Sequence, residues 1–521
     1  MLNLANLHEV KNKLNDIDVK EFQNINNSYR FFLNEIEIIE FRHLVNLKIP
    51  FEHPVTVLTG TNKIGKTSIL LLIACSHENF FKMDSTSPDI GMRIHIWKDM
   101  LAFTKYENTT KNYSYKLTWR VGNDIRHGEG KRLATSKAWS GLGKKSSNDS
   151  RINSKIKDKH VRLIDLERIL PLRNFSNSLL RKTQTSERIR LHEDVEQAYG
   201  YIFDILNVQI YQIGIHINKV CYLINHEYES YSSYNAASGE EAMITILKDI
   251  IEAPNNSLIL IDEIEAGFHP TLQRKLADIL QYLSWRDKKQ FIITTHSPTL
   301  ISAFPQKSRK FIDRKIDGSF EVINKISKQA AFSKMDAKAY PLINLYCEDD
   351  EAEFLIKKVI LSINLVHKHF GRLINIIKSG PIYQVKNDYE RHKRNYKYMS
   401  MKTGYCCVFD GDYKNNPDYS NFYENINEFS FFIYPYDAPE KFLIKAYLYE
   451  KPNDQLKSAL THNDHHSLFN EMVTIGLATD DKDARNQCFE IFKMKPEYRK
   501  LECDLRNFLE ITVSHFSELS D

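Results

Sequence analysis

Cysteine pairs of the metal-binding or redox kind are missing from this chain of 521 residues. Its 7 cysteines are odd in number, and no two of them have the C-x-x-C spacing of a zinc ribbon or a dithiol redox centre. Most stand beside apolar residues, so we expect buried, reduced thiols. These cysteines are Cys75, Cys221, Cys347, Cys406, Cys407, Cys488 and Cys503.

Long apolar runs are also missing. No run approaches the roughly 18 residues that a membrane-spanning helix needs, and the first residues do not have the charged-then-apolar pattern of a signal peptide. Heptads long enough for a coiled-coil arm and internal repeats are absent as well. We therefore expect no membrane association and a soluble protein in the reducing cytoplasm.

Charge of one sign is not in strong excess, and glycine and proline are few. The formal net charge is +4, with 42% hydrophobic and 26% charged residues, 18 glycines and 15 prolines. This composition is typical of folded globular proteins and permits nucleic-acid binding without arguing for it. The length suggests about two to four domains.

Changes of sequence texture predict four regions. Apolar residues three or four apart (Leu4, Leu7, Val10, Leu14) predict a helix near the N-terminus, and alternating β-branched residues from Phe31 predict the first strands of a sheet. The predicted regions are a helical extension (1–27), an ATPase domain (28–330, with an insertion at about 122–230), a second α/β domain (341–450) and a helical C-terminal region (451–521).

The first part of the insertion, residues 122–160, carries basic residues among Gly, Ser and Asn. It is either a solvated surface insertion or a strip that binds a nucleic-acid backbone. Its basic residues are Lys131, Arg132, Lys137, Lys144, Lys145 and Arg151.

The strongest motif is GTNKIGKTS, from Gly60 to Ser68, which matches G-x-x-x-x-G-K-[ST] between an apolar strand and an apolar helix. The glycines let backbone N–H groups surround phosphates at the positive end of the helix. We expect Lys66 to reach the outer phosphates and Thr67 to hold Mg²⁺. The residues predicted to contact the nucleotide in this loop are Gly60, Asn62, Gly65, Lys66, Thr67 and Ser68.

A second motif, LILIDEIEAGFHP, places an acidic pair after a buried strand. Two carboxylates at the end of a parallel strand are poorly explained as core residues. We expect Asp262 to bind Mg²⁺, directly or through water, and Glu263 to polarise the attacking water. Downstream, the strand in QFIITTHS ends near His296, which is well placed to sense a γ-phosphate. Upstream, Ser238 and Gly239 open a helix in SGEE.

Together, GTNKIGKTS, SGEE, LILIDEIEAGFHP and TTHS resemble the ABC superfamily of ATPases, and within it the OLD-like (overcoming lysogenisation defect) branch. The resemblance covers about residues 30–310. It implies ATP and Mg²⁺ as cofactors, a homodimer or higher oligomer in which Ser238 and Gly239 contact the nucleotide of the other protomer, and a place for Arg42 near the nucleotide. Lys63 stands where relatives often have Gly.

The second domain has its own acidic motifs. An apolar strand in LINLYCEDDEAEF ends at Glu348, and another in GYCCVFDGD ends at Asp410 and Asp412. Carboxylates at two strand ends of one α/β unit can converge at its carboxyl edge and hold one or two Mg²⁺ ions for phosphodiester cleavage.

This pattern resembles the Toprim fold of topoisomerases, primases and OLD-family nucleases, over about residues 342–450. The likeness implies catalytic and metal-binding roles for Glu348, Asp410 and Asp412, and makes Glu440 a weaker candidate ligand. Asp349 stands where relatives usually have Gly. The predicted fold is therefore α/β: an ABC-type P-loop ATPase head with a helical insertion, followed by a smaller Toprim-like domain.

Between the acidic motifs lies a basic segment, KNDYERHKRNYKYMSMKTG, with interleaved tyrosines. It is either a platform for unpaired bases and phosphates or a solvated basic helix. Its residues of interest are Lys386, Tyr389, Arg391, Lys393, Arg394, Tyr396, Lys397 and Tyr398.

Two functions follow from these motifs. One is a defence ATPase whose nucleotide-driven dimerisation regulates a Mg²⁺-dependent nuclease acting on DNA or RNA. The other is a non-cleaving ATPase sensor or scaffold with a degenerate Toprim domain, controlling a separate effector such as a helicase, an HNH nuclease or a reverse transcriptase. An ABC transport ATPase is a weaker third reading, because it leaves Glu348 and Asp410 unexplained.

Overall fold

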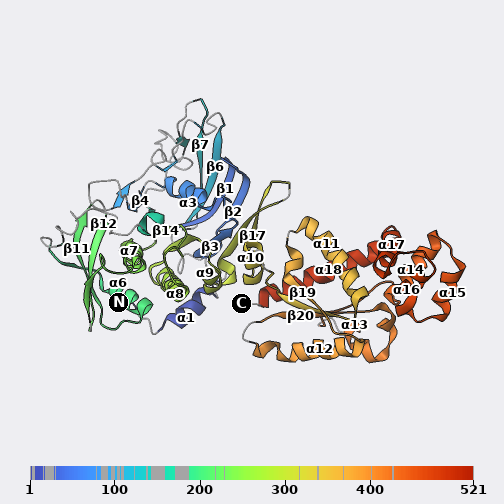
Figure 1. Cartoon of the computed structure of the whole chain (residues 1–521). Helices are drawn as coiled ribbons and strands as arrows, with labels where there is room; N and C mark the ends of the chain where they lie inside the picture. Colours follow the sequence, from blue (N-terminus) through green and yellow to red (C-terminus); the bar gives the residue numbers. More distant parts are fainter. Residues whose placement is uncertain are drawn as a thin grey trace. The chain divides into compact units, whose positions relative to one another are not determined.

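The computed structural model divides the chain into two compact units, Met1–Ile326 (unit 1) and Ser327–Asp521 (unit 2), each described here by itself (Figure 1). The residues that the structure describes are 2, 6–15, 17, 29, 31–77, 79–83, 92–94, 100–101, 106, 111–122, 124–135, 139–141, 159–169, 183, 187–216, 219–227, 229–315, 317–336, 339–367, 369–399, 402–424 and 428–519.

Unit 1 is built around an 8-stranded sheet within its described residues, in the order β17-β16-β3-β15-β14-β9-β4-β5. The strands from β16 to β4 are mutually parallel, and β17 and β5 pair antiparallel at the edges. The strands are β3 (Val55–Gly60), β4 (Asn79–Met83), β5 (Met92–Ile94), β9 (His160–Ile164), β14 (Leu258–Ile261), β15 (Gln290–Thr294), β16 (Arg309–Arg314) and β17 (Phe320–Asn324).

Both faces of this sheet are covered, which explains why β3, β14 and β15 are buried at every residue. Ile259 and Ile261 of β14 face one core, and Leu258 and Leu260 face another. The first core packs against helices α1 (Leu7–Asn15), α6 (Glu193–Phe203), α7 (Ser238–Glu252), α8 (Pro270–Asp287) and α9 (Pro298–Ala303).

The second core lies between the large sheet and a 5-stranded antiparallel sheet, with α3 (Lys66–Cys75) contributing to it. Helix α3 is apolar almost all round, as expected for a helix buried on several sides. The antiparallel sheet has the order β2-β1-β6-β7-β8. Its strands are β1 (Phe31–Phe41), β2 (Leu44–Pro50), β6 (Tyr113–Val121), β7 (Asp124–Arg132) and β8 (Trp139–Gly141).

The helical insertion predicted at about 122–230 is wrong for the residues that the structure describes there. Strand β7 pairs along its whole length with β6, and β9 is an inner strand of the large sheet. A further antiparallel sheet has the order β10-β11-β12-β13. Helix α6 is the α-helix whose bounds the structure describes in this range. The basic residues misled the prediction because β7 alternates charged and small residues instead of apolar ones. The strands of this sheet are β10 (Ile189–Arg190), β11 (Gln209–His216), β12 (Lys219–Asn225) and β13 (Ser230–Ser232).

The predicted N-terminal helix is confirmed over α1, where Leu7, Val10 and Leu14 are buried in the first core; Leu4 lies outside the described residues. Lys11 forms an ion pair of 2.6 Å with Asp278 of α8. The segment therefore packs as part of unit 1.

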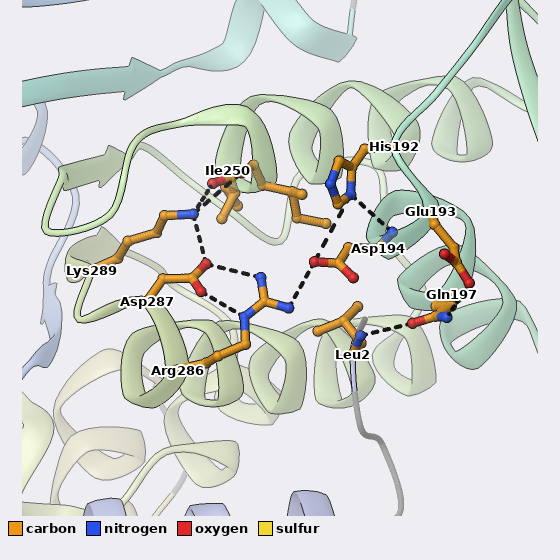
Figure 2. A network of polar contacts seen from close by, with 10 residues as sticks. Leu2, His192, Glu193, Asp194, Gln197, Ile250, Arg286, Asp287 and Lys289 are labelled. Carbon is orange, nitrogen blue, oxygen red and sulfur yellow. Dashed lines mark hydrogen bonds and ion pairs between the residues drawn. The ribbon is translucent and has the colours of Figure 1, made fainter.

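A polar network fixes helices α6, α7 and α8 to the sheet (Figure 2). Arg286 forms ion pairs with Asp194 at 2.7 Å and with Asp287 at 2.6 Å. The fully buried Lys289 binds Asp287 and donates at 2.9 Å to the carbonyl of Ile250. Lysine at this place satisfies carbonyl groups at the C-terminal end of α7, where a cation is favoured by the helix dipole. The network thus holds the helix whose other end begins at Ser238.

Unit 2 contains a 4-stranded parallel sheet among its described residues, in the order β19-β18-β20-β21. Leu345 and Val408 face a core shared with α11 (Asp350–Val366), and Tyr346 and Phe409 face a core shared with α12 (Ile382–Asn395). The strands are β18 (Ile343–Cys347), β19 (Ile374–Lys378), β20 (Gly404–Phe409) and β21 (Ser430–Phe432).

The C-terminal residues are helical, as predicted, but residue 450 is not a boundary between compact units. Leu456, Leu468, Leu501 and Phe516 are buried in the same core as β18 and β20. The polar faces of these helices hid this packing from sequence reasoning. The helices are α14 (Pro439–Glu450), α15 (Asp454–His462), α16 (Leu468–Thr474), α17 (Asp481–Phe492) and α18 (Pro496–Leu519).

Candidate active sites

The first candidate site lies at the carboxyl edge of the large sheet in unit 1. Strand β3 leads into the loop before α3, β14 ends directly before Asp262, and β15 ends two residues before His296. These strands are parallel neighbours in the order β3-β15-β14, so their carboxyl ends meet at one edge. In α/β sheets, ligands bind outside this edge.

The glycines of the loop are required by the backbone path. Gly60 has φ 153°, and a Cβ there would lie 2.6 Å from the carbonyl oxygen of Ile312. Gly65 has φ 99°, and a Cβ there would lie 2.9 Å from the side chain of Leu44. Lys63 has φ 62°, in the left-handed region that glycine tolerates better. This explains why glycine suits the position of Lys63 in related loops.

Lys66 is held inside the loop. Its Nζ donates to the Gly60 carbonyl at 3.1 Å and the Thr61 carbonyl at 3.4 Å, and lies 2.8 Å from Nε2 of His296. Burial lowers the pKa of Lys66 to about 8, and the charges of Glu263, Asp262 and Glu265 oppose this shift. A partly dehydrated ammonium group at a helix N-terminus is suited to bind phosphate.

Asp262 joins the loop to two strands. It accepts hydrogen bonds from Thr67 Oγ1 at 2.9 Å and from Thr294 Oγ1 at 2.5 Å, and it is only 5% exposed. A hydroxyl and a carboxylate oxygen this close are hard ligands of the kind that Mg²⁺ prefers. The predicted pair Thr67 and Asp262 therefore fits a magnesium ion.

Glu263 is placed by its backbone. It has φ 44°, its N–H donates to Thr294 Oγ1 at 2.8 Å, and its carbonyl accepts from Arg168 Nη2 at 2.6 Å. A non-glycine residue in the left-handed region costs of order 1–3 kcal/mol and persists where surrounding contacts enforce it. The contacts here aim the half-buried carboxylate at the loop cavity.

Arg168 is the residue of this site that sequence reasoning did not assign. Glu167 and Arg168 lie in the 3₁₀ helix η3 (Leu166–Ile169) that follows β9. The Arg168 Nη1 donates to the carbonyl of Asp262 at 3.0 Å, and Nη2 to that of Glu263. The sequence signal was a basic residue shortly after a buried strand, which is too common to interpret alone.

His296 contacts both sides of the site. Its backbone N–H donates to Glu265 Oε1 at 2.6 Å, and its ring nitrogen Nε2 faces Lys66. Burial and the neighbouring charge of Lys66 lower the pKa of His296. A neutral imidazole accepts a hydrogen bond from the lysine ammonium in this arrangement.

A cavity of about 370 Å³ opens between these groups. Of the residues predicted from the loop, Asn62, Gly65, Lys66, Thr67 and Ser68 line it; Gly60 is not part of this lining. The other lining residues are His43, Lys63, Ile64, Asp262, Glu263 and His296.

The described lining of this cavity includes His43 but not Arg42, which is exposed in the turn between β1 and β2. The prediction for Ser238 and Gly239 concerns the nucleotide of another protomer, which a single chain does not test. Gly239, in the first turn of α7, is not among the described lining residues, and a Cβ there would lie 2.8 Å from the carbonyl oxygen of Gly267. That close approach explains the glycine.

The second candidate site lies at the carboxyl edge of the sheet in unit 2. Glu348 follows β18 and Asp410 follows β20, and these strands are parallel neighbours with Tyr346 opposite Cys407. The strand order changes direction between β18 and β20, which is where α/β sheets bind ligands. Asp412 follows in the 3₁₀ helix η8 (Gly411–Asn415) and is exposed.

The carboxylates of this site are short of partners. Glu348 Oε2, Asp410 Oδ1 and Glu440 Oε2 are buried without a hydrogen-bond partner among the described residues. Burial raises the pKa of Glu348 to about 7, with Asp349 and Asp412 adding to the shift. Burial likewise raises the pKa of Asp410 well above its usual value, and the charges of Glu348, Asp349 and Glu440 add to it. Glu348, Asp410 and Asp412 do not form a set of three ligand atoms within 4.8 Å of one another; among the described residues, that spacing is met by Glu440, His465 and His466. The unpartnered oxygens of Glu348 and Asp410 would still be stabilised by a divalent cation, which would supply positive charge.

Asp349 has a structural explanation. Its side chain caps α11, accepting from the backbone N–H groups of Glu351 at 2.9 Å and Ala352 at 3.0 Å. An aspartate N-cap stabilises a helix start by about 1 kcal/mol. At the position where relatives usually have glycine, this chain therefore has an aspartate that caps the start of α11.

Of the two interpretations of the basic segment in unit 2, a base-stacking platform does not fit two of its tyrosines. Tyr389 is fully buried in the core under α12, and the half-buried Tyr396 packs edge-on against Phe516. Lys393 pairs with Glu428, and Arg391 pairs with Asp388. The tyrosines recur at helical spacing because they pack against the sheet, a pattern that sequence alone does not distinguish from stacking.

The alternative of a nucleic-acid-binding strip at residues 122–160 loses two of its basic side chains to contacts within the protein. Arg132 is buried beside the ring of Tyr113, and Lys131 forms an ion pair of 2.8 Å with Glu129. Lys137, Lys144, Lys145 and Arg151 lie outside the described residues.

Residues 101–302 match a family model described as "AAA domain, putative AbiEii toxin, Type IV TA system". The matched range contains Ser238, Asp262 and His296 and begins after the phosphate loop. The AAA domain named by this family model agrees with the nucleotide-binding geometry of the phosphate loop.

Three solved structures are similar to parts of this chain, each covering 56% of it. They are the SMC head domain from Thermotoga maritima (12% identity, TM-score 0.35, 98% of that chain covered), the Smc head domain with an extended coiled coil bound to the C-terminal domain of ScpA derived from Pyrococcus furiosus (11%, 0.34, 96%), and the recombination mediator protein RecF-ATPrS in the RecFOR pathway (12%, 0.31, 98%). TM-scores of this size support no conclusion on function.

Of the helices that the structure describes, none has the length and apolar character that crossing a membrane requires.

Proposed function

We propose that unit 1 binds and hydrolyses ATP with Mg²⁺, and that nucleotide-driven dimerisation of this unit regulates a Mg²⁺-dependent nuclease site in unit 2. The observation that carries the first part is the contact of Thr67 Oγ1 with Asp262 Oδ2 at 2.9 Å, beside Lys66. It brings together the hydroxyl, carboxylate and ammonium groups that a magnesium–triphosphate complex needs.

Each residue of unit 1 then has a defined task. Lys66 exchanges its carbonyl contacts for the outer phosphates, and Thr67 and Asp262 hold the cation. Glu263 accepts a hydrogen bond from the attacking water and orients it toward the γ-phosphate. His296 donates to or accepts from the γ-phosphate region through the ring nitrogen that now faces Lys66. Bound Mg²⁺ neutralises charge that develops on the phosphate oxygens.

Dimerisation follows from the position of Ser238 and Gly239. They lie at the N-terminal end of α7, which is favourable for binding a phosphate, and Gly239 is not among the described residues that line the cavity of its own chain. A second copy would present this helix end to the nucleotide, closing the site. ATP would therefore be shared between two protomers.

For unit 2, we infer cleavage of phosphodiester bonds in DNA or RNA. The buried, unpartnered oxygens of Glu348 and Asp410 at the change of strand direction support a cation site, with Asp412 at its open side. A cation bound there would polarise a phosphoryl oxygen and lower the pKa of bound water. The charge of Lys441 acts on Asp412 and opposes the rise in the pKa of Asp412 that burial causes. Lys441 is thus a candidate for contacting the leaving phosphate.

One observation favours the alternative of a non-cleaving sensor that acts through a partner effector. Tyr389 and Tyr396 are core residues, so the base-binding surface expected beside the carboxylates is reduced. In that case unit 2 would serve assembly, and a partner such as a helicase, HNH nuclease or reverse transcriptase would act on nucleic acid.

Paired substitutions test the proposal on the full chain. Glu263→Gln should abolish ATP hydrolysis while keeping ATP binding. Glu348→Gln and Asp410→Asn should each abolish Mg²⁺-dependent cleavage of supercoiled plasmid and single-stranded RNA and leave ATPase activity unchanged. Asp418→Asn, an exposed aspartate close in sequence, is the matched control and should cleave normally. Cleavage that survives in both carboxylate variants would refute the nuclease site.

A further inference from the structure

A histidine-containing cluster lies near the carboxylates of unit 2. Glu440 stands in the first turn of α14, and His465 and His466 form the 3₁₀ helix η10 (His465–Ser467) between α15 and α16. One potential ligand atom from each of these residues lies within 4.8 Å of the others. No spacing signal in the sequence marks this cluster, because 24 residues lie between Glu440 and His465, and helix α15 is among them.

The ligand atoms are close to the separations of a metal coordination sphere. His466 Nδ1 lies 3.0 Å from Glu440 Oε1. Around a tetrahedral ion with bonds of about 2.0–2.1 Å, neighbouring ligand atoms lie about 3.3 Å apart. The third ligand lies within 4.8 Å of the other two, a separation that side-chain rotation can shorten.

Glu440 is built into the cluster rather than placed on a solvated surface. It is 3% exposed, and its second oxygen, Oε2, is buried with no hydrogen-bond partner among the described residues. A buried carboxylate oxygen without a partner is costly unless a cation or a donor satisfies it. His466, in contrast, is exposed, which leaves a path for an ion from solvent.

An outer partner orients one of the imidazoles. Asp464 Oδ1 lies 3.2 Å from Nδ1 of His465, and the same carboxylate caps the start of η10. Histidine ligands of metals commonly bind a carboxylate through one ring nitrogen and the ion through the other. Nε2 of His465 is the nitrogen left for an ion.

We propose that Glu440, His465 and His466 bind a divalent transition-metal ion, Zn²⁺ in its commonest form. Two imidazoles and one carboxylate are the ligand set of open zinc sites, whereas Mg²⁺ prefers oxygen ligands alone. Three protein ligands leave at least one coordination position for water or a phosphate oxygen. Glu440 also neighbours the Glu348 and Asp410 carboxylates, and its charge acts on Asp410. The two histidines are not part of that acidic set, and metal binding by the cluster does not depend on the proposed cleavage activity.

The test uses the full-length protein, stripped with chelator and free of nucleotide. Co²⁺ is titrated into the protein, because its visible ligand-field bands report binding by nitrogen and oxygen ligands. Zn²⁺ is then added to displace the Co²⁺, and mass spectrometry counts the metal ions bound per chain. We expect one Co²⁺ per chain with ligand-field bands that Zn²⁺ removes and that millimolar Mg²⁺ does not.

Four variants locate the ion. His466→Ala and Glu440→Gln should abolish the bands, and Asp464→Asn should weaken Co²⁺ binding about 10-fold, as loss of an outer-shell charge does. The double variant Glu348→Gln with Asp410→Asn should keep the bands, which separates this site from the proposed nuclease site. His462→Asn, an exposed histidine at the end of α15, is the matched control and should bind as the natural protein does.

Each other outcome counts against the site. Bands that persist in His466→Ala, or that vanish in the Glu348 and Asp410 double variant, would overturn it, as would absence of stoichiometric Co²⁺ in the natural protein. Because His466 is exposed, its substitution leaves the fold intact, and circular dichroism verifies this. Plasmid cleavage plays no part in the readout, so failure of the proposed nuclease would leave the result unaffected.

Discussion

At the residue scale, the nucleotide site depends on groups whose hydrogen bonds cross from strand to strand. Asp262 is bound to Thr67 and Thr294, and Lys66 faces His296. The motif residues themselves could be predicted from the sequence, because the chemistry of phosphate binding restricts which residue types serve. The role of Arg168 could not be predicted, because Arg168 binds backbone carbonyls, and such contacts do not produce a recognisable sequence motif.

Arg168 is expected to position the acidic pair without touching nucleotide. Its Arg168→Met variant removes the side-chain donor to the carbonyls of Asp262 and Glu263, of which the Glu263 carbonyl keeps the N–H of Ala266 at 2.9 Å. A buried acceptor left unpaired costs about 1–3 kcal/mol. We expect kcat for ATP hydrolysis to fall at least about tenfold while KM for ATP changes little. Steady-state kinetics measures both, with exposed Arg188→Met as control. Equal loss in kcat and ATP affinity would instead indicate a direct contact.

Lys66 makes ATP affinity depend on pH. Burial lowers its pKa to about 8 in the nucleotide-free protein, so the charged form that binds phosphate is lost above that pH. The sign follows from linkage: phosphate favours the protonated lysine, so affinity is full below pH 8 and falls as pH rises, by up to about tenfold per unit. Calorimetry between pH 7 and 9.5 measures this. Lys66→Arg stays charged, so whatever affinity it retains should not show this decline.

At the scale of elements, strands were easier to predict than the helices around them. Continuous apolar runs such as LILI identify strands covered on both faces, and the structure confirms β3, β14, β15, β18 and β20. The β7 strand escaped prediction because its order comes from pairing with β6. The C-terminal helices were recognised as helices, yet their packing depends on long-range contacts that periodicity does not encode.

Helix α18 is expected to stabilise the sheet of unit 2. Phe516 is 1% exposed, and its ring lies so close to Gly404 that a Cβ on that glycine would meet it at 2.3 Å. Phe516→Ala should lower the free energy of unfolding of this unit by about 3–5 kcal/mol. Ile511→Ala, on the same helix at a side chain 65% exposed, should change it by no more than about 0.5 kcal/mol. Urea unfolding compares the two, and similar values would show that α18 does not contribute to the core.

At the scale of the whole molecule, two compact units each bring acidic residues to the carboxyl edge of a parallel sheet. The sequence predicted both edges because strand ends and acidic residues are local features. Closure of the nucleotide site by a second chain remains a prediction, since it depends on contacts that one chain does not contain.

Dimerisation should therefore require ATP and an intact Ser238. In Glu263→Gln, bound ATP persists, so light scattering should report a dimer with ATP and a monomer without it. Adding Ser238→Arg should return the protein to a monomer, while exposed Ser514→Arg should not. A dimer that forms equally without nucleotide would contradict regulation by ATP.

The central claim is that ATP with Mg²⁺ binds between Lys66, Thr67 and Asp262, and calorimetric titration of the full chain tests it most directly. We predict saturable binding by the natural protein and a loss of about 10- to 100-fold in affinity in Lys66→Ala, the range expected when charge-assisted hydrogen bonds are removed. Absence of ATP binding by the natural protein, or equal affinity in Lys66→Ala, would contradict the account.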